Sequence, residues 1–423
     1  MACGECRGMV TVMEREDAAA DVAATAPAVS ERLEAFMTDI AAGLGRSEQR
    51  RCAGLYARGL LEAGARKSLE PIVARLGEDG DYEALQNFLA DSPWDPALIQ
   101  RAVAERVAPQ IGVEAWVIDD TGIPKDGKHS PGVKRQYSGT LGKIGNCQIA
   151  VSVHAVGARG TVPLHWALYL PEEWCQDAAR RRSAKIPEEV AFQTKPQLAA
   201  DLIERAASWE IPRAPVLGDE AYGDNTALRE RLHGAGRQYV LAVGAATTVY
   251  APETTFAVPA RGAGRGRPPS RARPDREPEA IKALIARLGA QAAQTVAFRD
   301  GPEGTPMSSQ FIFVRVRAAH DVPGRDGPSR EEWLIAEWPD GADAPLDYWI
   351  SNLPADTPPE RMARLARLRW KIELDYRQLK GELGLDHYEG RSWIGWHHHT
   401  ALVTAAHGFL TLERMRPNRR RPA

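Results

Sequence analysis

Two short apolar runs in the middle of the chain each end in an aspartate. The first, AWVIDD, covers residues 115–120, and the second precedes Asp219 in the segment APVLGDEAYGDN, residues 214–225. Short apolar runs bounded by turn residues are typical of strands buried on both faces of a sheet. A sheet that contains both runs therefore carries carboxylates at the ends of two of its strands.

The neighbouring segments predict the rest of this sheet. Residues 146–157 and 161–170 have strand character and form a predicted hairpin, and residues 237–244 form a last strand. A helix is predicted near residues 194–209, before the second aspartate run. The order strand–strand–strand–helix–strand–helix–strand predicts an α/β protein with a mixed sheet of the ribonuclease H kind and helices on both faces. We expect the two strands that end in aspartates to be neighbours.

A third acidic residue lies on a predicted helix near the C-terminal end of the sequence. The segment PPERMARLARLRWKIELDYRQLK, residues 358–380, places apolar side chains on one stripe at about 100° per residue. Arg369, Glu373 and Lys380 lie on a second stripe along the edge of that apolar face. By itself, this second stripe also fits a surface helix with ordinary ion pairs between residues four apart.

Changes in composition and pattern divide the chain into five parts. They are a small all-α domain (1–108), the first part of the α/β domain (109–244), an inserted β-rich domain (245–355), the closing helices of the α/β domain (356–415) and a basic tail (416–423). The insertion contains a Gly/Pro/Arg-rich tract, residues 261–279, that predicts a flexible loop.

The formal net charge of −2 gives the whole chain no preference for anionic partners. Local patches bind phosphate, however, and the loop after the first strand carries Lys125, Lys128, Lys134 and Arg135. We interpret this basic loop as a contact with a phosphate backbone, and a solvated loop is the alternative.

The sequence has no run of 18 apolar residues, and its first residues lack the pattern of a signal peptide. Cys3 and Cys6 form a lone CxxC without a second pair, which disfavours a zinc site. We therefore expect a soluble, cytoplasmic protein without a membrane segment.

Two other motifs are weak candidates for a functional site, and a third kind of site has no motif in the sequence. Residues 122–129, GIPKDGKH, approach the phosphate-binding loop pattern, but His129 replaces the hydroxyl residue and no helix pattern follows. His397, His398 and His399 are consecutive on a predicted helix, so they point about 100° apart and cannot converge on one ion. A GxSxG turn, typical of serine hydrolases, is absent from the sequence.

The acids on the two strands and the helix are the strongest candidates. They are Asp120 or its neighbour Asp119, then Asp219, then Glu373, with separations of 99 (219 − 120) and 154 (373 − 219) residues. Three hard oxygen ligands that meet at one place suit Mg²⁺, with Mn²⁺ as a substitute. Two such ions roughly 4 Å apart would support phosphoryl transfer.

The same segments resemble a known enzyme family. RWKIELDYRQLK resembles the signature helix of the DDE transposases of bacterial cut-and-paste insertion sequences, which spaces Tyr, Arg, Glu and Lys with two, three and six residues between them. Arg369, Glu373 and Lys380 match its last three positions, whereas Ala366 stands at the tyrosine position. VIDDTG and GDEAYG resemble the motifs around the first and second acids, and the β-rich block matches the family's inserted domain. Over nearly its whole length, the chain is most similar to insertion-sequence family 701.

The resemblance implies a transposase that binds Mg²⁺ through Asp120, Asp219 and Glu373. It implies cleavage of DNA at the element's terminal inverted repeats, transfer of the 3′-hydroxyls to target DNA, and a homodimer in the synaptic complex on the nucleoid. Arg369 and Lys380 would hold the phosphates, and the N-terminal helices are candidates for recognising the DNA ends. The alternatives are an inactive DNA-binding descendant and a structure-selective nuclease of the same fold.

The first acid is one of two adjacent residues. Successive residues of a strand point to opposite faces, so Asp119 and Asp120 cannot both enter one site while the strand stays regular. Both faces of this run are apolar, and its pattern does not choose between them. The family's metal-binding aspartate commonly precedes a threonine, and Asp120 precedes Thr121, so the resemblance favours Asp120. The side chain of Asp119 would then point away from the site.

Overall fold

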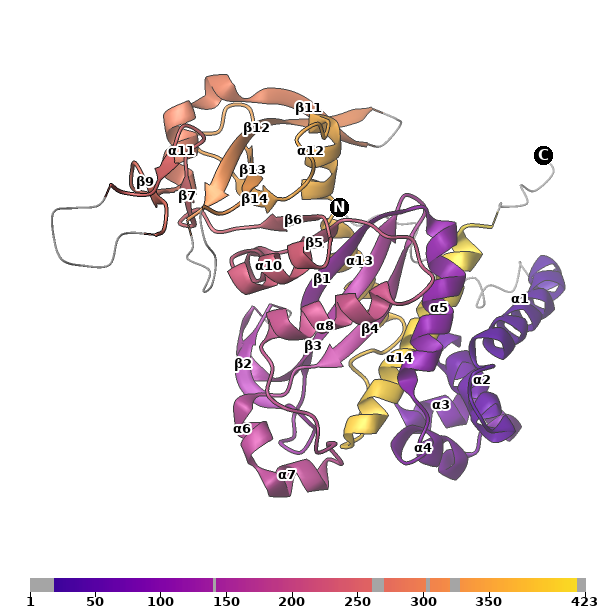
Figure 1. The fold of residues 1–423 in the computed structure, drawn as a ribbon. Coiled ribbons are helices and arrows are strands. Elements are labelled where there is room, and N and C mark those ends of the chain that lie inside the picture. The colour runs from indigo at the N-terminus through magenta and orange to yellow at the C-terminus, as the bar shows by residue number, and fades with distance from the viewer. Residues whose placement is uncertain (1–18, 140–141, 261–269, 302–304, 320–327, 417–423) are drawn as a thin grey trace.

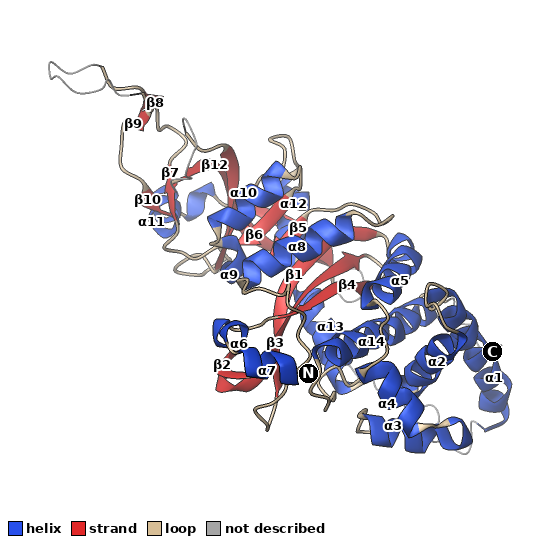
Figure 2. Cartoon of the chain, turned by 60° about the horizontal axis from the view of Figure 1, so that its bottom comes forward, coloured by secondary structure: helices blue, strands red, loops and turns tan. Residues whose placement is uncertain are grey.

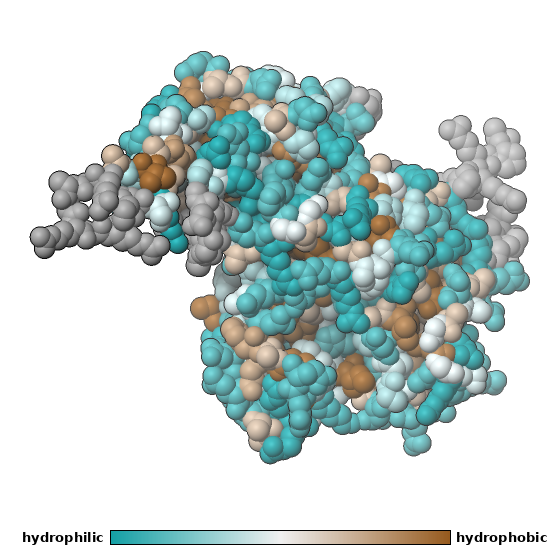
Figure 3. Space-filling view, in the orientation of Figure 1, coloured by the Kyte–Doolittle hydropathy of each residue, from teal (hydrophilic) through white to brown (hydrophobic). Residues whose placement is uncertain are grey.

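The computed structural model describes residues 19–139, 142–260, 270–301, 305–319 and 328–416 (Figure 1). Helices lie at both ends of the described chain, and strands gather in its middle (Figure 2). Polar residues cover most of the face that Figure 3 shows, and apolar residues are scattered among them. Within the described ranges, no helix has the length and hydrophobicity of a membrane span.

In the described residues, five α-helices precede the sheet and lie near α14 (Trp393–Arg414), the last helix described (Figure 1). They are α1 (Ala19–Ile40), α2 (Ser47–Leu61), α3 (Leu69–Leu76), α4 (Tyr82–Ala90) and α5 (Pro96–Ile111). The Tyr56 hydroxyl lies 2.9 Å from Nδ1 of His399, and the His398 ring bonds the carbonyls of Leu89 and Trp94. Two of the three consecutive histidines thus join the N-terminal helices to α14.

The central sheet has the predicted mixed topology. Its strands are β1 (Val113–Pro124), β2 (Lys134–Ser138), β3 (Lys143–Gly157), β4 (Thr161–Leu168), β5 (Val216–Gly218) and β6 (Tyr239–Ala242). Strand β3 is antiparallel to β1 and β4, whereas β5 is parallel to β1 and β6 is parallel to β5. The prediction that the two aspartate strands are neighbours is confirmed, since Val117 pairs with Leu217.

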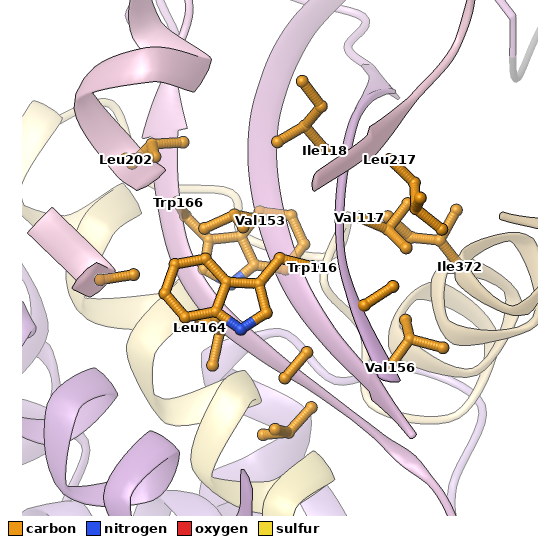
Figure 4. Packing of buried hydrophobic residues seen from close by; sticks show 14 of the residues in the cluster. Trp116, Val117, Ile118, Val153, Val156, Leu164, Trp166, Leu202, Leu217 and Ile372 are labelled. Carbon is orange, nitrogen blue, oxygen red and sulfur yellow. The ribbon is translucent and has the colours of Figure 1, made fainter. Parts of the chain in front are cut away.

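Helices cover both faces of this sheet. Outside the insertion, the helices described after β4 are, besides α14, α6 (Glu172–Gln176), α7 (Ala178–Ser183), α8 (Lys195–Ala207), α9 (Glu220–Gly223), α10 (Thr226–Gly234), α12 (Pro359–Arg367) and α13 (Trp370–Gly381). Thr194 caps α8 by accepting from the Gln197 amide, which starts the helix where the sequence predicts it. Helices α8 and α13 lie against β1 and β3 from opposite faces (Figure 4).

The inserted strands continue the central sheet. Strand β14 (Asp347–Ser351) pairs antiparallel with β6, and the order from that point is β14–β13–β12. The other inserted elements are β7 (Thr248–Tyr250), β8 (Phe256–Ala257), β9 (Arg273–Pro274), β10 (Glu279–Ala280), α11 (Ile281–Leu288), β11 (Gln294–Asp300), β12 (Pro306–Ala318) and β13 (Glu331–Glu337). Strands β2 and β11 were not predicted, because each pairs with a single neighbour and has little burial to impose apolar alternation.

The segment 358–380 forms two helices, and the prediction of one continuous helix is wrong. Between α12 and α13, the amides of Lys371 and Ile372 bond the carbonyls three residues before them, at 3.3 and 3.0 Å. This tighter turn places Arg369 at the start of α13. The break has a tertiary cause, because α12 packs on β6 and β11 whereas α13 packs on β1, β3 and β4.

A buried polar network holds α13 against the sheet. Asp375 is 5% exposed, and one of its carboxylate oxygens lies 2.9 Å from Nδ1 of His154 on β3. The next residue of the helix, Tyr376, shares a 2.8 Å hydrogen bond with Ser152. Burial raises the pKa of Asp375, but the hydrogen bond with His154 helps to keep it below its ordinary value. The network therefore sets the rotation of α13 about its axis.

Three predicted features lie outside the described residues, wholly or in part. Cys3 and Cys6 belong to residues 1–18, and most of the basic tail belongs to residues 417–423. The Gly/Pro/Arg-rich tract is described only from residue 270 onward.

Replacing His154 with alanine should lower the free energy of unfolding by about 3 kcal/mol, since it removes the imidazole that is hydrogen-bonded to a buried carboxylate. Urea unfolding monitored by circular dichroism measures this change. His129→Ala, at an exposed histidine, should change it by less than about 0.5 kcal/mol. Adding Asp375→Asn to His154→Ala should recover part of the loss, and a double variant with no recovery would contradict the buried-charge account.

Candidate active site

Asp119 and Asp219 lie at equivalent positions of two neighbouring strands. Asp219 directly follows β5, but the prediction that the first strand ends at its aspartates is wrong, because β1 continues to Pro124. Strands β1 and β5 pair in register at Val117 and Leu217, so the two aspartates follow at equivalent positions two residues later. Asp219 ends its strand and caps α9, accepting from the amides of Ala221 at 3.0 Å and Tyr222 at 3.4 Å. Its position after the strand and its hydrogen bonds to α9 fix the Asp219 carboxylate at the carboxyl end of β5.

Asp119 faces α13. Its partner on the antiparallel strand β3 is Ser152, whose hydroxyl bonds Tyr376 of α13. Directly opposed residues point to the same face of a sheet, so Asp119 shares the face of Ser152. Figure 4 shows Val117, two residues before Asp119, beside Ile372 of the same helix, with Ile118 on the other side of the strand.

Asp120 faces the opposite side of the sheet. Its carboxylate forms a 2.9 Å ion pair with Lys195 at the start of α8. Asp120 still lies close enough to Asp219 to raise the pKa of that residue. The structure thus divides the two adjacent aspartates between α13 and α8.

Arg369 joins two of the candidate acids. One of its terminal nitrogens lies 3.0 Å from Oδ2 of Asp119, and the other lies 3.2 Å from Oε1 of Glu373. The side chain of Glu373 is 61% exposed, whereas that of Asp119 is 13% exposed. The guanidinium group therefore links the buried acid on the sheet to the exposed acid on the helix.

The pKa values of both strand acids are raised. The pKa of Asp119 is raised to about 7, mainly because the carboxylate is buried; Arg369 opposes this rise and the nearby Asp219 adds to it. Burial also raises the pKa of Asp219, again opposed by Arg369. Two desolvated carboxylates of like charge repel one another, so this place favours a positively charged ligand.

A cavity of about 630 Å³ opens beside these acids. Asp219, Arg369 and Glu373 line one side of it, and the inserted strand β11 contributes Arg299 to its wall. The guanidinium of Arg299 lies 4.9 Å from the ring centre of Trp370, another lining residue. The sequence analysis identified neither of these residues. Arg299 lies on β11, a strand that was not predicted, whereas the position of Trp370 directly after Arg369 was a signal in the sequence.

The predicted basic residues fall into two groups. Lys380 donates to the Gly122 carbonyl at 2.8 Å, and Lys125 donates to the Tyr388 carbonyl at 2.5 Å. Burial lowers the pKa of each of these lysines to about 8. In contrast, Lys128, Lys134 and Arg135 are exposed, and Lys134 forms a 2.9 Å ion pair with Glu173.

The donor chemistry of the acids fits a divalent cation. Carboxylate oxygens are the ligands that Mg²⁺ and Mn²⁺ prefer. Asp119 and Glu373 form ion pairs with Arg369, and Asp219 and Glu373 line the cavity beside it. In the part of the chain that the structure describes, no three His, Cys, Asp or Glu side chains are arranged to hold a metal ion. Arg369 takes up carboxylate oxygens of two of these acids, so they can share a cation only when it releases them.

Comparisons with known proteins agree with this geometry. The sequence model of a family described as DDE superfamily endonuclease matches residues 39–305, a range that ends before Glu373. The chain is 33% identical over 162 residues to the "Probable transposase for insertion sequence element IS701" of Microchaete diplosiphon. That alignment covers 38% of this chain and 40% of the relative.

Asp119→Asn should stabilise the free protein at pH 8. The folded-state pKa of Asp119 is about 7, against about 3.9 in an unfolded chain, so the folded protein retains a proton that the unfolded chain releases. Stability is therefore lost as pH rises from about 4 to 7, and the full cost is present above pH 7. Thermal or urea unfolding should show a gain of up to roughly 4 kcal/mol at pH 8 and almost none at pH 4.

Asp120→Asn is the matched control, because it removes an ion pair with Lys195 and should bring no gain at pH 8. If the wild-type protein is as stable at pH 8 as the Asp119→Asn variant, burial of the charged Asp119 carboxylate is not unfavourable and the prediction is wrong.

Proposed function

Because the chain belongs to the DDE superfamily of endonucleases, we propose that it is a DNA transposase. It would cut the ends of its own insertion sequence and join the freed 3′-hydroxyls to target DNA. The observation that carries this proposal is the arrangement of Asp119, Asp219 and Glu373 around Arg369, beside a cavity open to a substrate. The similarity to an insertion-sequence transposase supports it over 40% of that relative's length.

For the first acid we propose Asp119, whereas the motif comparison in the sequence favours Asp120. Asp119 and Asp219 each stand two residues beyond the Val117–Leu217 pair, and Asp119 shares Arg369 with Glu373, so a modest side-chain movement could bring these three carboxylates together. Asp120 instead pairs with Lys195 on the face covered by α8.

We propose that Asp119, Asp219 and Glu373 hold divalent cations, Mg²⁺ or Mn²⁺. The bound ions would supply activation of the attacking oxygen and stabilisation of the leaving oxygen in phosphoryl transfer. Asp219 keeps its orientation throughout, because its cap of α9 fixes one oxygen on backbone amides. Arg369 would release the acids and turn its guanidinium to a phosphate of the bound DNA, for which its planar fork is well suited.

The partners in this proposal are the element's terminal inverted repeats and a target duplex, bound by two copies of the chain on cytoplasmic, nucleoid DNA. The exposed residues Lys128, Lys134 and Arg135 are proposed to contact phosphates, and the N-terminal helices to recognise the ends. Lys125 and Lys380 are weaker candidates, because both are half-buried and bond backbone carbonyls.

Asp219→Asn and Glu373→Gln should each abolish cleavage of DNA that carries the native ends, while the protein still folds and binds that DNA. Asp119→Asn should also abolish cleavage, and Asp120→Asn should leave a measurable fraction. Gel assays in Mg²⁺ and in Mn²⁺ measure both effects. The reverse ranking of Asp119 and Asp120 in both metals would move the first acid to Asp120. Cleavage without strand transfer, independent of the end sequence, would indicate a structure-selective nuclease.

Arg369→Ala should weaken binding to DNA ends and reduce the slope of log affinity against log salt by about 0.9, the value for one lost phosphate contact. Arg377→Ala is the control, since Arg377 is an exposed arginine of the same helix that does not line the cavity. Lys380→Ala tests the second predicted contact in the same titration. An unchanged salt slope for Arg369→Ala would limit this residue to pairing with the acids.

A further inference from the structure

A two-stranded ribbon extends from the central sheet beyond the end of β1. Strand β1 ends at Pro124, which pairs with Cys147, whereas β3 begins at Lys143. Residues 143–145 therefore pair with β2 alone, whereas Asn146 also accepts a hydrogen bond from the Lys125 amide just beyond β1. Strand β2 stands at one end of the strand order, and both cartoon views place it at the margin of the molecule (Figures 1 and 2).

The ribbon carries an exposed apolar pair. Tyr137 on β2 lies directly opposite Ile144 on β3, and these side chains are 65% and 61% exposed. They are the two most exposed large apolar side chains in the described part of the chain. Single exposed apolar residues are ordinary, but two that face each other on a narrow ribbon form one apolar surface.

This apolar pair lies on the same face of β3 as the candidate active site. Ile144 and Ser152 are an even number of residues apart, with no register shift between them, and Ser152 is the cross-strand partner of Asp119. Eight residues of a strand span about 26 Å at 3.3 Å per residue. At about 3.4 Å per base pair, this is the length of roughly eight base pairs of duplex DNA.

The charge of the ribbon fits a polyanion. Arg135 and Lys143 are exposed on its two strands, and neither β2 nor β3 contains an aspartate or glutamate. Lys134 is partly neutralised by Glu173, which leaves Arg135 and Lys143 as the clearer phosphate ligands. In a symmetric contact between two copies of the ribbon, the cations of one copy would repel those of the other. Charge therefore favours DNA over self-association.

We propose that the β2–β3 ribbon binds the minor groove of DNA about eight base pairs from the cut and bends it. Tyr137 and Ile144 would press on a base step as an apolar wedge, and Arg135, two residues before Tyr137 and on the same face, would bind a flanking phosphate. Lys143, which faces the other side of the ribbon, would bind a second phosphate from that side. Ile144 has no hydrogen-bonding group for reading base edges and Tyr137 has only its hydroxyl, so the pair is poorly suited to sequence readout in the major groove. This inference rests on the proposed function, because it assumes DNA at Asp219 and Glu373.

A bending assay tests the proposal with the full chain. The probe is a duplex that contains the native element end, with two fluorophores placed on either side of the step eight base pairs from the cut. Energy transfer between them reports the bend, and the Glu373→Gln background prevents cleavage during the measurement. The variants are Tyr137→Ala/Ile144→Ala and Arg135→Gln/Lys143→Gln, and the control is Phe192→Ala, an aromatic residue that is 40% exposed elsewhere.

The apolar double variant should lose the bend while it keeps the salt slope of binding. The charge double variant should reduce that slope by about 1.8, the value for two lost phosphate contacts. An unchanged bend in the apolar double variant overturns the inference. The inference is also overturned if wild-type protein without DNA sediments as a dimer that this variant dissociates, because the pair is then a protein interface.

The assay separates this inference from the proposed function. Wild-type protein that bends end DNA without cutting it would disprove the transposase reaction and leave the role of the ribbon standing. Wild-type protein that cuts end DNA while the apolar double variant bends it normally would disprove the role of the ribbon alone.

Discussion

The contact of Arg369 with Asp119 and Glu373 is the interaction on which the arrangement of the site depends. Burial and the nearby Asp219 both disfavour a charged Asp119, and the guanidinium group is the neighbour that opposes them. The same group ties the first strand of the sheet to the start of α13. A cation from the protein thus stabilises a site whose own carboxylates repel one another, and binding of another cation would have to compete with it.

The position of Arg369 depends in turn on the packing of two helices. Helix α12 packs on the inserted strand β11 and on β6. Helix α13 is held on the central sheet by the hydrogen bonds of Asp375 with His154 and of Tyr376 with Ser152. Strand β14 pairs with β6, so the insertion is continuous with the sheet that carries the acids. This continuity brings Arg299 of β11 over Trp370 and makes the insertion one wall of the cavity.

Hydrophobic periodicity predicted most of the fold, because buried elements leave a regular pattern. The core strands, the helix before Asp219 and the order of the acids all follow from it, and the comparison with the DDE superfamily agrees. The pattern failed for β2 and β11, which are weakly buried, and for the break at Arg369, which comes from packing on two different surfaces. The catalytic roles of the acids and the metal they bind stay predictions.

By itself, the sequence determined which two strands carry the aspartates and which basic residues accompany Glu373, since these are local properties of short segments. Only the tertiary structure decided that Asp119 faces α13 and Arg369 while Asp120 faces α8 and Lys195. The physical reason is that β1 is covered on both faces, so its side chains are apolar on both and alternation carries no information. The direction of each aspartate follows from which helix packs on which face, and distant segments of the chain determine that packing.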